Sequence, residues 1–284
     1  MKKKEEKSSK MKYILLIVII IGIISFLYAR FISTRGLLIK EYAIKSSELP
    51  AEYNGFKIVH FSDLHYGSTI GIKELKTIVK RINDQKPDIV VFTGDLIEEG
   101  VKLSETEIQD IIKELNKINP TIETLCVIGN HDYDHNYWNL IIPNTNWKQL
   151  DNTYEYVYKD SKIPLVFTGL DDLTNGEPDY DNAFSFLNET ENNLYTIALI
   201  HEPDQIDKIK YDTDLVLAGH SHLGQVRLPL IGAIYTPIGS KKYYDEHYIL
   251  KDTEMYINGG IGTSLLKVRF FCKPSINLYR FYTK

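Results

Sequence analysis

Cysteine is scarce in this chain, whose 284 residues include only Cys126 and Cys272. Two cysteines are too few for a disulfide framework. Cys126 lies in an apolar run, where a free thiol behaves as a small core hydrophobe. We therefore expect no structural disulfide, and the 43% apolar content is enough for one large domain with an appendage.

An excess of basic residues is absent as well, because 33 Lys and Arg face 38 Asp and Glu. The net charge of −5 and the pI near 5.9 differ from the basic balance that is typical of general nucleic-acid binders. We therefore expect no nucleic-acid partner. The sequence also lacks internal repeats and extended low-complexity segments, which leaves an ordinary globular domain as the expectation.

Charge is missing altogether from residues 13–29, which are rich in Ile, Leu, Val and Phe. This run of 17 residues lies at the lower end of the length that spans a bilayer. The span extends to Ile32 if Arg30 directs its charged end toward the membrane surface. We therefore expect a transmembrane signal anchor at 13–32, preceded by a basic tail at 1–12.

A cleaved secretory signal peptide is the alternative, because a basic start and an apolar core are common to both kinds of segment. No clear cleavage site with two small residues follows the apolar run, which favours the uncleaved anchor. Six lysines precede the run, whereas Arg30 and Arg35 flank its far side. The positive-inside rule then predicts a single-pass protein of the cell membrane, with a cytoplasmic N-terminus and an extracytoplasmic domain.

A juxtamembrane segment at 33–55, which includes a first strand, is followed by short apolar runs that alternate with polar loops and amphipathic stretches. The runs are too short for helices and mostly rich in β-branched residues, so they indicate buried strands. We predict these strands at 57–61, 89–93, 125–128, 165–168, 196–200 and 215–218. Apolar residues recur at helical spacing between the first three runs, and Ser104 with Glu107 has the pattern of a capping box. Strand, helix, strand order predicts parallel pairing.

The helical pattern ends at Val226, and short alternating segments with Gly and Pro continue to the C-terminus. Residues 255–258 and 276–281 have the pattern of closing strands. Since no linker separates the two halves, residues 56–284 are predicted to form one α/β domain.

Side chains that bind metals follow directly on five of the predicted strands. They are Asp63 and His65, Asp95, Asn130 with His131 and Asp132, His201, and His220 with His222. The carboxyl ends of the strands in an α/β sheet line one crevice, which is where ligands bind. We therefore expect the five segments to converge on one site.

The chemistry of this set indicates a metal site. Asp, Asn and His together suit Mn, Fe or Zn better than Ca or metals that prefer thiolates. Seven ligands from this set of nine side chains exceed the need of one ion. They are enough for two divalent ions if one carboxylate bridges them. A two-metal site of this kind is the usual clamp for phosphoryl transfer.

Five short motifs resemble those of the calcineurin-like metallophosphoesterase superfamily. They are D-x-H at 63–65, G-D-x-x-[DE] at 94–98, G-N-H-[DE] at 129–132, the isolated His201, and G-H-x-H at 219–222, in this order. The resemblance covers about residues 56–284. It implies a catalytic domain with the αββα fold, in which two facing mixed β-sheets are flanked by helices, and a metal-dependent phosphoesterase activity.

Within the superfamily the chain is similar to a bacterial membrane-associated branch. Residues 220–229 read H-S-H-L-G-Q-V-R-L-P, residues 260–264 read G-I-G-T-S, and residues 269–272 read R-F-F-C. The chain departs from that branch at Leu223, where Gly is expected, and at Gly259, where Arg is common. Neither position is an expected ligand, so these departures concern substrate selection.

The resemblance also implies a role for each site residue. One metal would take Asp63, His65 and His222, the other would take Asn130, His201 and His220, and Asp95 would bridge them. A metal-activated hydroxide would be the nucleophile. His131 would face the leaving-group oxygen as general acid or stabiliser, with Asp132 orienting it.

Two questions stay open at the level of sequence. The first is whether the chain is a catalytically inactive binding scaffold, although loss of ligands is what such a scaffold should show and the set here is complete. The second is whether the substrate is a phosphodiester, a pyrophosphate or a phosphomonoester. The short segment 30–56 keeps the domain close to the bilayer, so we expect a lipid-linked or cell-envelope substrate.

Other polar residues are expected to be structural. His60, His135 and His247 fit no motif. Asp171 and Asp172 follow a predicted strand on the same rim, where they are expected to cap a loop or support a ligand.

Overall fold

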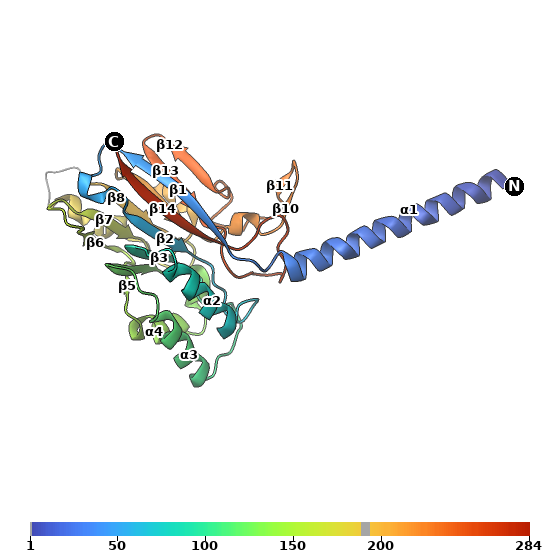
Figure 1. The fold of residues 1–284 in the computed structure, drawn as a ribbon, viewed down its shortest axis with the longest axis horizontal. Helices are drawn as coiled ribbons and strands as arrows, with labels where there is room; N and C mark the ends of the chain where they lie inside the picture. Colours follow the sequence, from blue (N-terminus) through green and yellow to red (C-terminus); the bar gives the residue numbers. More distant parts are fainter. Residues whose placement is uncertain (1, 189–193) are drawn as a thin grey trace.

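The computed structural model describes residues 2–188 and 194–284 (Figure 1). Helix α1 (Lys2–Leu27) projects away from the rest of the chain and continues into the π-helical turn η1 (Tyr28–Ile32). Residues Lys10–Ile32 form a helix that is long and apolar enough to cross a membrane. The predicted apolar anchor is therefore one continuous helix.

The first sheet has six strands in the order β1-β14-β2-β3-β4-β5. Their bounds are Leu38–Ser46 for β1, Ser275–Thr283 for β14, Lys57–Phe61 for β2, Ile89–Thr93 for β3, Glu123–Val127 for β4 and Trp147–Gln149 for β5. Strands β2 to β5 are parallel, as the strand, helix, strand order predicts, whereas β14 is antiparallel to β2. The juxtamembrane strand β1 pairs along its whole length with β14, so the segment after the helix belongs to this sheet.

The second sheet also has six strands, in the order β12-β13-β9-β8-β7-β6. Their bounds are His247–Leu250 for β12, Thr253–Ile257 for β13, Leu215–Ala218 for β9, Thr196–Leu199 for β8, Leu165–Gly169 for β7 and Thr153–Val157 for β6. The four central strands are parallel and both edge strands are antiparallel. A separate hairpin joins β10 (Arg227–Leu228) to β11 (Gly232–Ala233).

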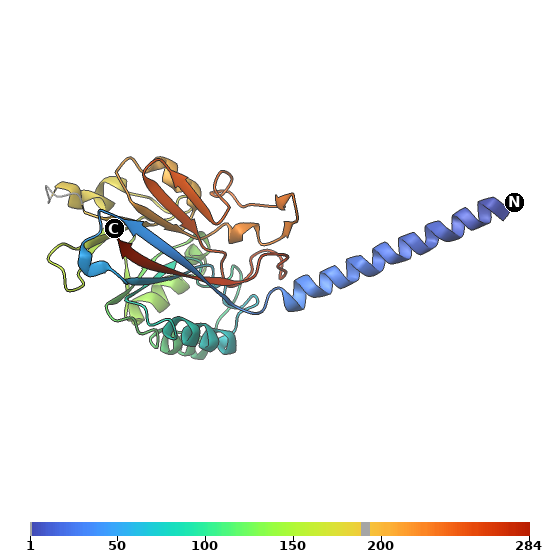
Figure 2. The same ribbon diagram turned by 45° about the horizontal axis from the view of Figure 1, so that its top comes forward.

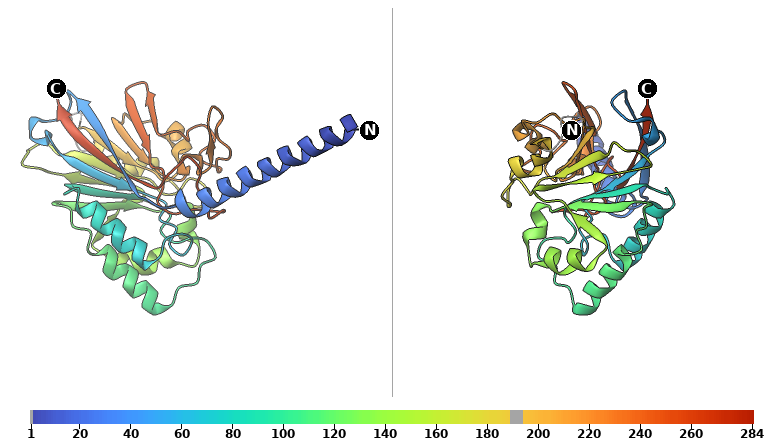
Figure 3. Two further views of the ribbon diagram at one scale, coloured as in Figure 1. Left: turned by 45° about the vertical axis from the view of Figure 1, so that its right-hand side comes forward. Right: turned by 90° about the vertical axis from the view of Figure 1, so that its left-hand side faces the viewer.

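The two sheets face each other, and helices cover the outer side of the first (Figures 2 and 3). These helices are α2 (Ile72–Asn83), α3 (Glu105–Leu115) and α4 (Tyr137–Ile141). Their apolar stripes, including Leu75 and Ile111, pack in one cluster with Val59 and Val90 of the sheet. A second cluster joins the inner faces, where Val91 of β3 packs with Phe167 of β7.

The outer side of the second sheet is covered by α5 (Tyr180–Ala183) and by neighbouring loops. Short helical turns complete the fold at Ala51–Tyr53, Asn130–Tyr133, Ile142–Asn144, Ser185–Asn188, Pro203–Lys208 and His222–Gly224. Helix, sheet, sheet and helix therefore form four layers, which confirms the predicted αββα arrangement of two mixed sheets.

The capping box predicted from the sequence is present in the structure. The Ser104 side chain accepts from the Glu107 backbone N–H at 3.3 Å, and the Glu107 carboxylate accepts from the Ser104 backbone N–H at 2.9 Å. This is the predicted capping box at the start of α3. Cys126 and Cys272 are both buried.

Candidate metal centre

The predicted site residues lie together at the carboxyl ends of strands from both sheets. Asp63 and His65 follow β2, Asp95 follows β3, Asn130 follows β4, His201 follows β8, and His220 with His222 follows β9. The six Asp and His residues among them are all buried, with no more than 7% of each exposed. Buried carboxylates and imidazoles are costly unless they are paired or hold a metal, so this arrangement needs an explanation.

One cluster contains Asp63, His65 and His222, whose ligand atoms lie within 4.8 Å of one another. The Nε2 atoms of His65 and His222 are 3.1 Å apart. Nε2 of His222 lies 3.4 Å from Oδ1 of Asp63. These three side chains are the ones that the resemblance assigns to the first metal.

A second cluster contains Asp95, His201 and His220, and Asn130 borders it. Nε2 of His201 lies 3.3 Å from Oδ2 of Asp95 and 3.1 Å from Oδ1 of Asn130. The same Asp95 oxygen lies 3.5 Å from Nε2 of His65 in the first cluster. Asp95 therefore reaches both clusters, as a bridging carboxylate must.

The hydrogen bonds of two imidazoles turn their other ring nitrogens toward each other. Nδ1 of His201 lies 2.6 Å from the carbonyl oxygen of Thr93, and Nε2 of His220 lies 2.6 Å from that of Ile238. A carbonyl oxygen only accepts, so these two nitrogens carry the ring protons. The remaining nitrogens, Nε2 of His201 and Nδ1 of His220, lie 3.1 Å apart. Burial would lower the pKa of His201, but Asp95 raises it well above its usual range, so without a metal a proton lies between these two nitrogens. A metal ion can replace that proton, so the donor set fits a metal ion.

Burial and neighbouring charges tune the same residues. Burial, followed by the neighbouring His201, lowers the pKa of His220 to about 3, so its imidazole is neutral and can offer a lone pair. Burial would raise the pKa of the Asp95 carboxyl, but His201 and His131 hold that pKa well below its usual range. Asp95 is therefore ionised, which is the form that binds metal.

Glu98 lies against the Nδ1 side of the His65 ring; its place in a motif predicted no specific role for it. Its Oε2 lies 2.6 Å from Nδ1 of His65. The two atoms are not aligned as a regular hydrogen bond, but at this distance the negative charge of the carboxylate favours a proton on Nδ1. The proton is thus held on Nδ1, and Nε2 is free toward the cluster.

Arg269 holds His222 in a different way. Its side chain is fully buried and donates to the carbonyl oxygens of Gly262 at 2.6 Å and Gly259 at 2.8 Å. One guanidinium nitrogen lies 3.1 Å from Nδ1 of His222. Burial, His65 and this guanidinium together hold the pKa of His222 well below its usual range, so His222 is neutral. The R-F-F-C segment marked Arg269, but only the structure places it against a candidate ligand.

Backbone strain recurs in the ligand loops. Five candidate ligands have left-handed backbones: Asp63 (φ 49°), His65 (φ 42°), Asp95 (φ 63°), His220 (φ 63°) and His222 (φ 48°). Such conformations are uncommon for residues other than glycine and persist where the surrounding structure enforces them. Gly129 permits close approach of two of these loops, because a methyl group there would lie 2.5 Å from Oδ1 of Asp95.

His131 lies beside the first cluster and is half-buried. Its ring stands edge-on to that of His65, with the ring centroids 4.8 Å apart. Its backbone N–H donates to Oδ1 of Asp95 at 2.9 Å, while its Nδ1 has no hydrogen-bond partner among the described residues. The His131 side chain also lines the pocket above the clusters, where it can contact a bound group.

Asp132 has a different arrangement from the expected one. Its carboxylate accepts from the backbone N–H groups of Asp95 and Leu96, both at 2.7 Å, and of Gly129 at 3.0 Å. Within the described residues, no hydrogen bond joins it to the His131 ring. Asp132 therefore connects the loop after β3 to the loop after β4. It positions Asp95, whereas we expected it to orient His131.

A pocket of about 410 Å³ opens above the two clusters. One side is polar and includes His65, Asp95, Asn130 and His131. The other side is apolar and consists of Val226, Ile234, Tyr235, Pro237, Leu265 and Leu266. The site therefore places a metal-binding set next to a surface that suits hydrocarbon.

The remaining polar residues have structural partners, as expected. The buried His60 lies 2.9 Å from Oγ1 of Thr93. Asp172 caps its own loop, because its Oδ1 accepts from the backbone N–H groups of Thr174 at 3.1 Å and Asn175 at 2.7 Å. His135 and His247 lie away from the clusters, each beside an acidic side chain.

Comparison with known proteins places this site in a family. The sequence profile of the calcineurin-like phosphoesterase family matches residues 56–224, which contain all seven candidate ligands. The metallophosphoesterase YkuE of Bacillus subtilis (strain 168) is 36% identical over 256 residues, which cover 89% of this chain and 88% of that protein.

Two further relatives are more distant. Phosphodiesterase YaeI of Escherichia coli (strain K12) is 27% identical, over 78% of this chain and 81% of its own length. A transmembrane protein with metallophosphoesterase domain from Danio rerio is 28% identical, over 82% of this chain and 54% of its own length. The chain therefore belongs to the calcineurin-like phosphoesterase family.

Proposed function

We propose that this chain is a membrane-anchored phosphoesterase with two divalent metals, Mn, Fe or Zn, held by the seven candidate ligands. The observation that carries the proposal is the pair of ring nitrogens of His201 and His220 that face each other at 3.1 Å, with the ionised Asp95 beside them. Bound metals would supply an activated hydroxide and neutralise charge on the phosphoryl group.

The protein's own residues divide the remaining work. Asp95 bridges the two ligand sets, and Asp132 fixes the Asp95 loop through three backbone hydrogen bonds. His131, whose Nδ1 is without a partner among the described residues, donates a proton to the leaving oxygen or stabilises its charge. A complete ligand set speaks against the alternative of an inactive scaffold.

The anchor proposal is supported by contacts between the helix and the catalytic domain. The backbone N–H of Arg269 donates to the carbonyl oxygen of Ala29 at 3.0 Å, and Tyr28 stacks edge-on against Phe270 at 5.8 Å. Cleavage after the apolar run would remove these contacts. We propose a cytoplasmic tail at 1–12, a membrane span at 13–32, a juxtamembrane segment at 33–55 and an extracytoplasmic catalytic domain at 56–284.

The substrate proposal is a phosphodiester or pyrophosphate at the membrane surface or in the cell envelope. Its support is that β1 begins at Leu38, so only a few residues separate the sheet from the end of the candidate span at Ile32. A related protein, YaeI, is named a phosphodiesterase.

One experiment tests the catalytic proposal. Full-length protein in detergent is stripped of metal, loaded with Mn, Zn, Fe or Mg, and assayed on chromogenic phosphomonoesters and phosphodiesters. We expect metal-dependent turnover that is lost in Asp95→Asn and retained in Asp110→Asn, an exposed residue of α3. Metal binding without turnover of any ester would support the scaffold instead.

A further inference from the structure

The β10–β11 hairpin lies at the end of the domain from which α1 leaves (Figure 1). Large apolar side chains of segments 230–234 and 265–271 are exposed. We call them the apolar rim; they are Leu230, Ile231, Ile234, Leu265, Leu266 and Phe271. Leu230 and Ile231 form the tip of the β10–β11 hairpin, and Leu230 is fully exposed. A contiguous exposed apolar surface marks a contact with another molecule or a membrane.

Contacts to the helix show what lies next to the rim. Phe270 and Phe271 contact the Tyr28 ring, with centroids 5.8 Å and 6.4 Å away. Tyr28 lies inside the candidate span, four residues before its end at Ile32. At a rise of about 1.5 Å per residue, this is roughly 6 Å along the helix. If the span crosses a bilayer, these aromatic side chains lie at its interface.

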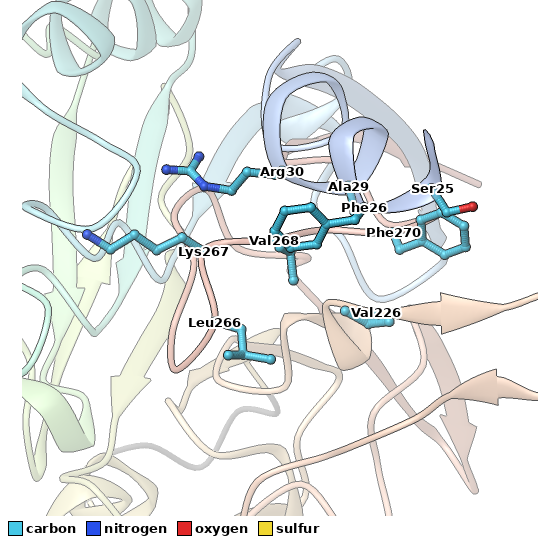
Figure 4. A pocket seen from close by; sticks show the side chains of 9 residues that line it. All are labelled: Ser25, Phe26, Ala29, Arg30, Val226, Leu266, Lys267, Val268 and Phe270. Atoms are coloured by element: carbon cyan, nitrogen blue, oxygen red, sulfur yellow. The ribbon is translucent and has the colours of Figure 1, made fainter. Parts of the chain in front are cut away.

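A groove of about 500 Å³ is lined by the helix and by residues of loop 266–270 (Figure 4). Its wall is largely apolar, with Phe26, Val268 and Phe270 among its residues. Arg30 and Lys267 extend to one side of it, away from these apolar groups. Among the described residues that line the groove, two are cationic and none is acidic. Aromatic rings and cations at one level suit the headgroup region of a bilayer.

The groove lies next to the pocket above the candidate metal centre. Val226 and Leu266 line both cavities. Beyond them, the pocket wall is formed by Ile234, Tyr235 and Leu265. A small polar phosphoester would leave this wall in water, whereas an acyl chain attached to the phosphoester would cover it.

We infer that the apolar rim inserts into the bilayer and that the candidate centre acts on phosphoesters of membrane lipids, whose acyl chains lie along the wall formed by Val226, Leu265 and Leu266. The inference rests on the proposed anchor and the proposed hydrolysis. In that hydrolysis water adds to phosphorus, the ester P–O bond breaks, and the leaving oxygen takes up a proton. The lipid would move sideways from the bilayer into the pocket.

Insertion is tested with the full-length chain in phosphatidylcholine and phosphatidylglycerol vesicles. Leu230→Cys carries an environment-sensitive fluorophore at the hairpin tip, and Ile163→Cys, an exposed position before β7, carries the same label as the matched control. The unsubstituted chain, treated with the same fluorophore, measures background labelling of the two buried native cysteines. We expect quenching by lipids with a shallow spin label at position 230 and none at 163. Equal, water-like emission at both positions would overturn insertion.

Acyl-chain binding is tested by competition against the chromogenic ester that the chain hydrolyses fastest. Dioctanoyl phosphatidic acid should inhibit at a concentration at least about tenfold below that of glycerol 3-phosphate, because burial of methylene groups adds affinity. Leu265→Asp should remove most of this difference. Equal inhibition by the two phosphates would contradict the inference. Lack of turnover with every metal and ester would refute the proposed hydrolysis instead, while the fluorescence result would still report on insertion.

Discussion

His201 and His220 face each other through Nε2 of the first and Nδ1 of the second, 3.1 Å apart. Each ring is fixed by a hydrogen bond from its other nitrogen to a carbonyl oxygen, on Thr93 and Ile238. These two residues lie 19 positions apart and follow strands β8 and β9 of the second sheet, whereas Asp95 follows β3 of the first. The centre is therefore assembled across both sheets.

Asp95→Asn should abolish turnover and lower the metal content. The amide keeps the size of the side chain but removes the charge that both ligand clusters share. Elemental analysis of the purified protein, beside a rate assay, measures both effects. Two metals per chain with normal activity in this variant would show that Asp95 does not bridge.

His131→Ala should keep both metals and lose about two to four orders of magnitude in rate, the usual contribution of a positioned acid. Its ring lies outside both implied ligand sets and contacts His65 edge-on. The loss should shrink for esters with very good leaving groups, which need little protonation. A loss of the same size across a leaving-group series would leave only electrostatic stabilisation for His131.

Glu98→Gln should weaken metal binding by about 10- to 100-fold, the usual effect of removing a carboxylate that supports a metal-binding histidine. The reason is its 2.6 Å contact with Nδ1 of His65. Glu99→Gln removes the same charge from the neighbouring, exposed position and serves as control. Competition with a fluorescent chelator gives both affinities, and an equal loss in the two variants would refute a specific role for Glu98.

Protease added to intact cells should cut the catalytic domain and leave a tag at Met1 protected. Lysines precede the candidate span in excess, and such residues stay in the cytoplasm. Immunoblots against the tag and against a C-terminal epitope follow the two ends separately, with permeabilised cells as the control. A digested tag beside an intact domain would reverse the proposed topology.

The buried strands and the ligand positions could be predicted because both leave a signal in adjacent residues. The run Ile89–Thr93 is apolar and β-branched, and Asp95 follows it within two positions. Edge strands gave no such signal: β6, at Thr153–Val157, mixes Thr, Tyr and Glu because it is only partly buried. The β12 strand at His247–Leu250 is similar.

The supporting residues could not be predicted because their roles depend on contacts between distant segments. Asp132 accepts a hydrogen bond from Asp95, 37 positions away, so its side chain is not available to the adjacent His131. Arg269 contacts His222 across 47 positions. Motif matching marks such residues, but only the packed structure shows which group each one touches.

The most direct test of the central claim is a Mn²⁺ titration of the metal-stripped, full-length protein, followed by electron paramagnetic resonance. Two ions that share a bridging carboxylate, about 3.5–4 Å apart, are coupled magnetically. We predict saturation at two Mn²⁺ per chain with a spin-coupled spectrum, and loss of that spectrum in Asp95→Asn. Saturation at one ion per chain, with the six-line spectrum of isolated Mn²⁺, would contradict a dinuclear centre.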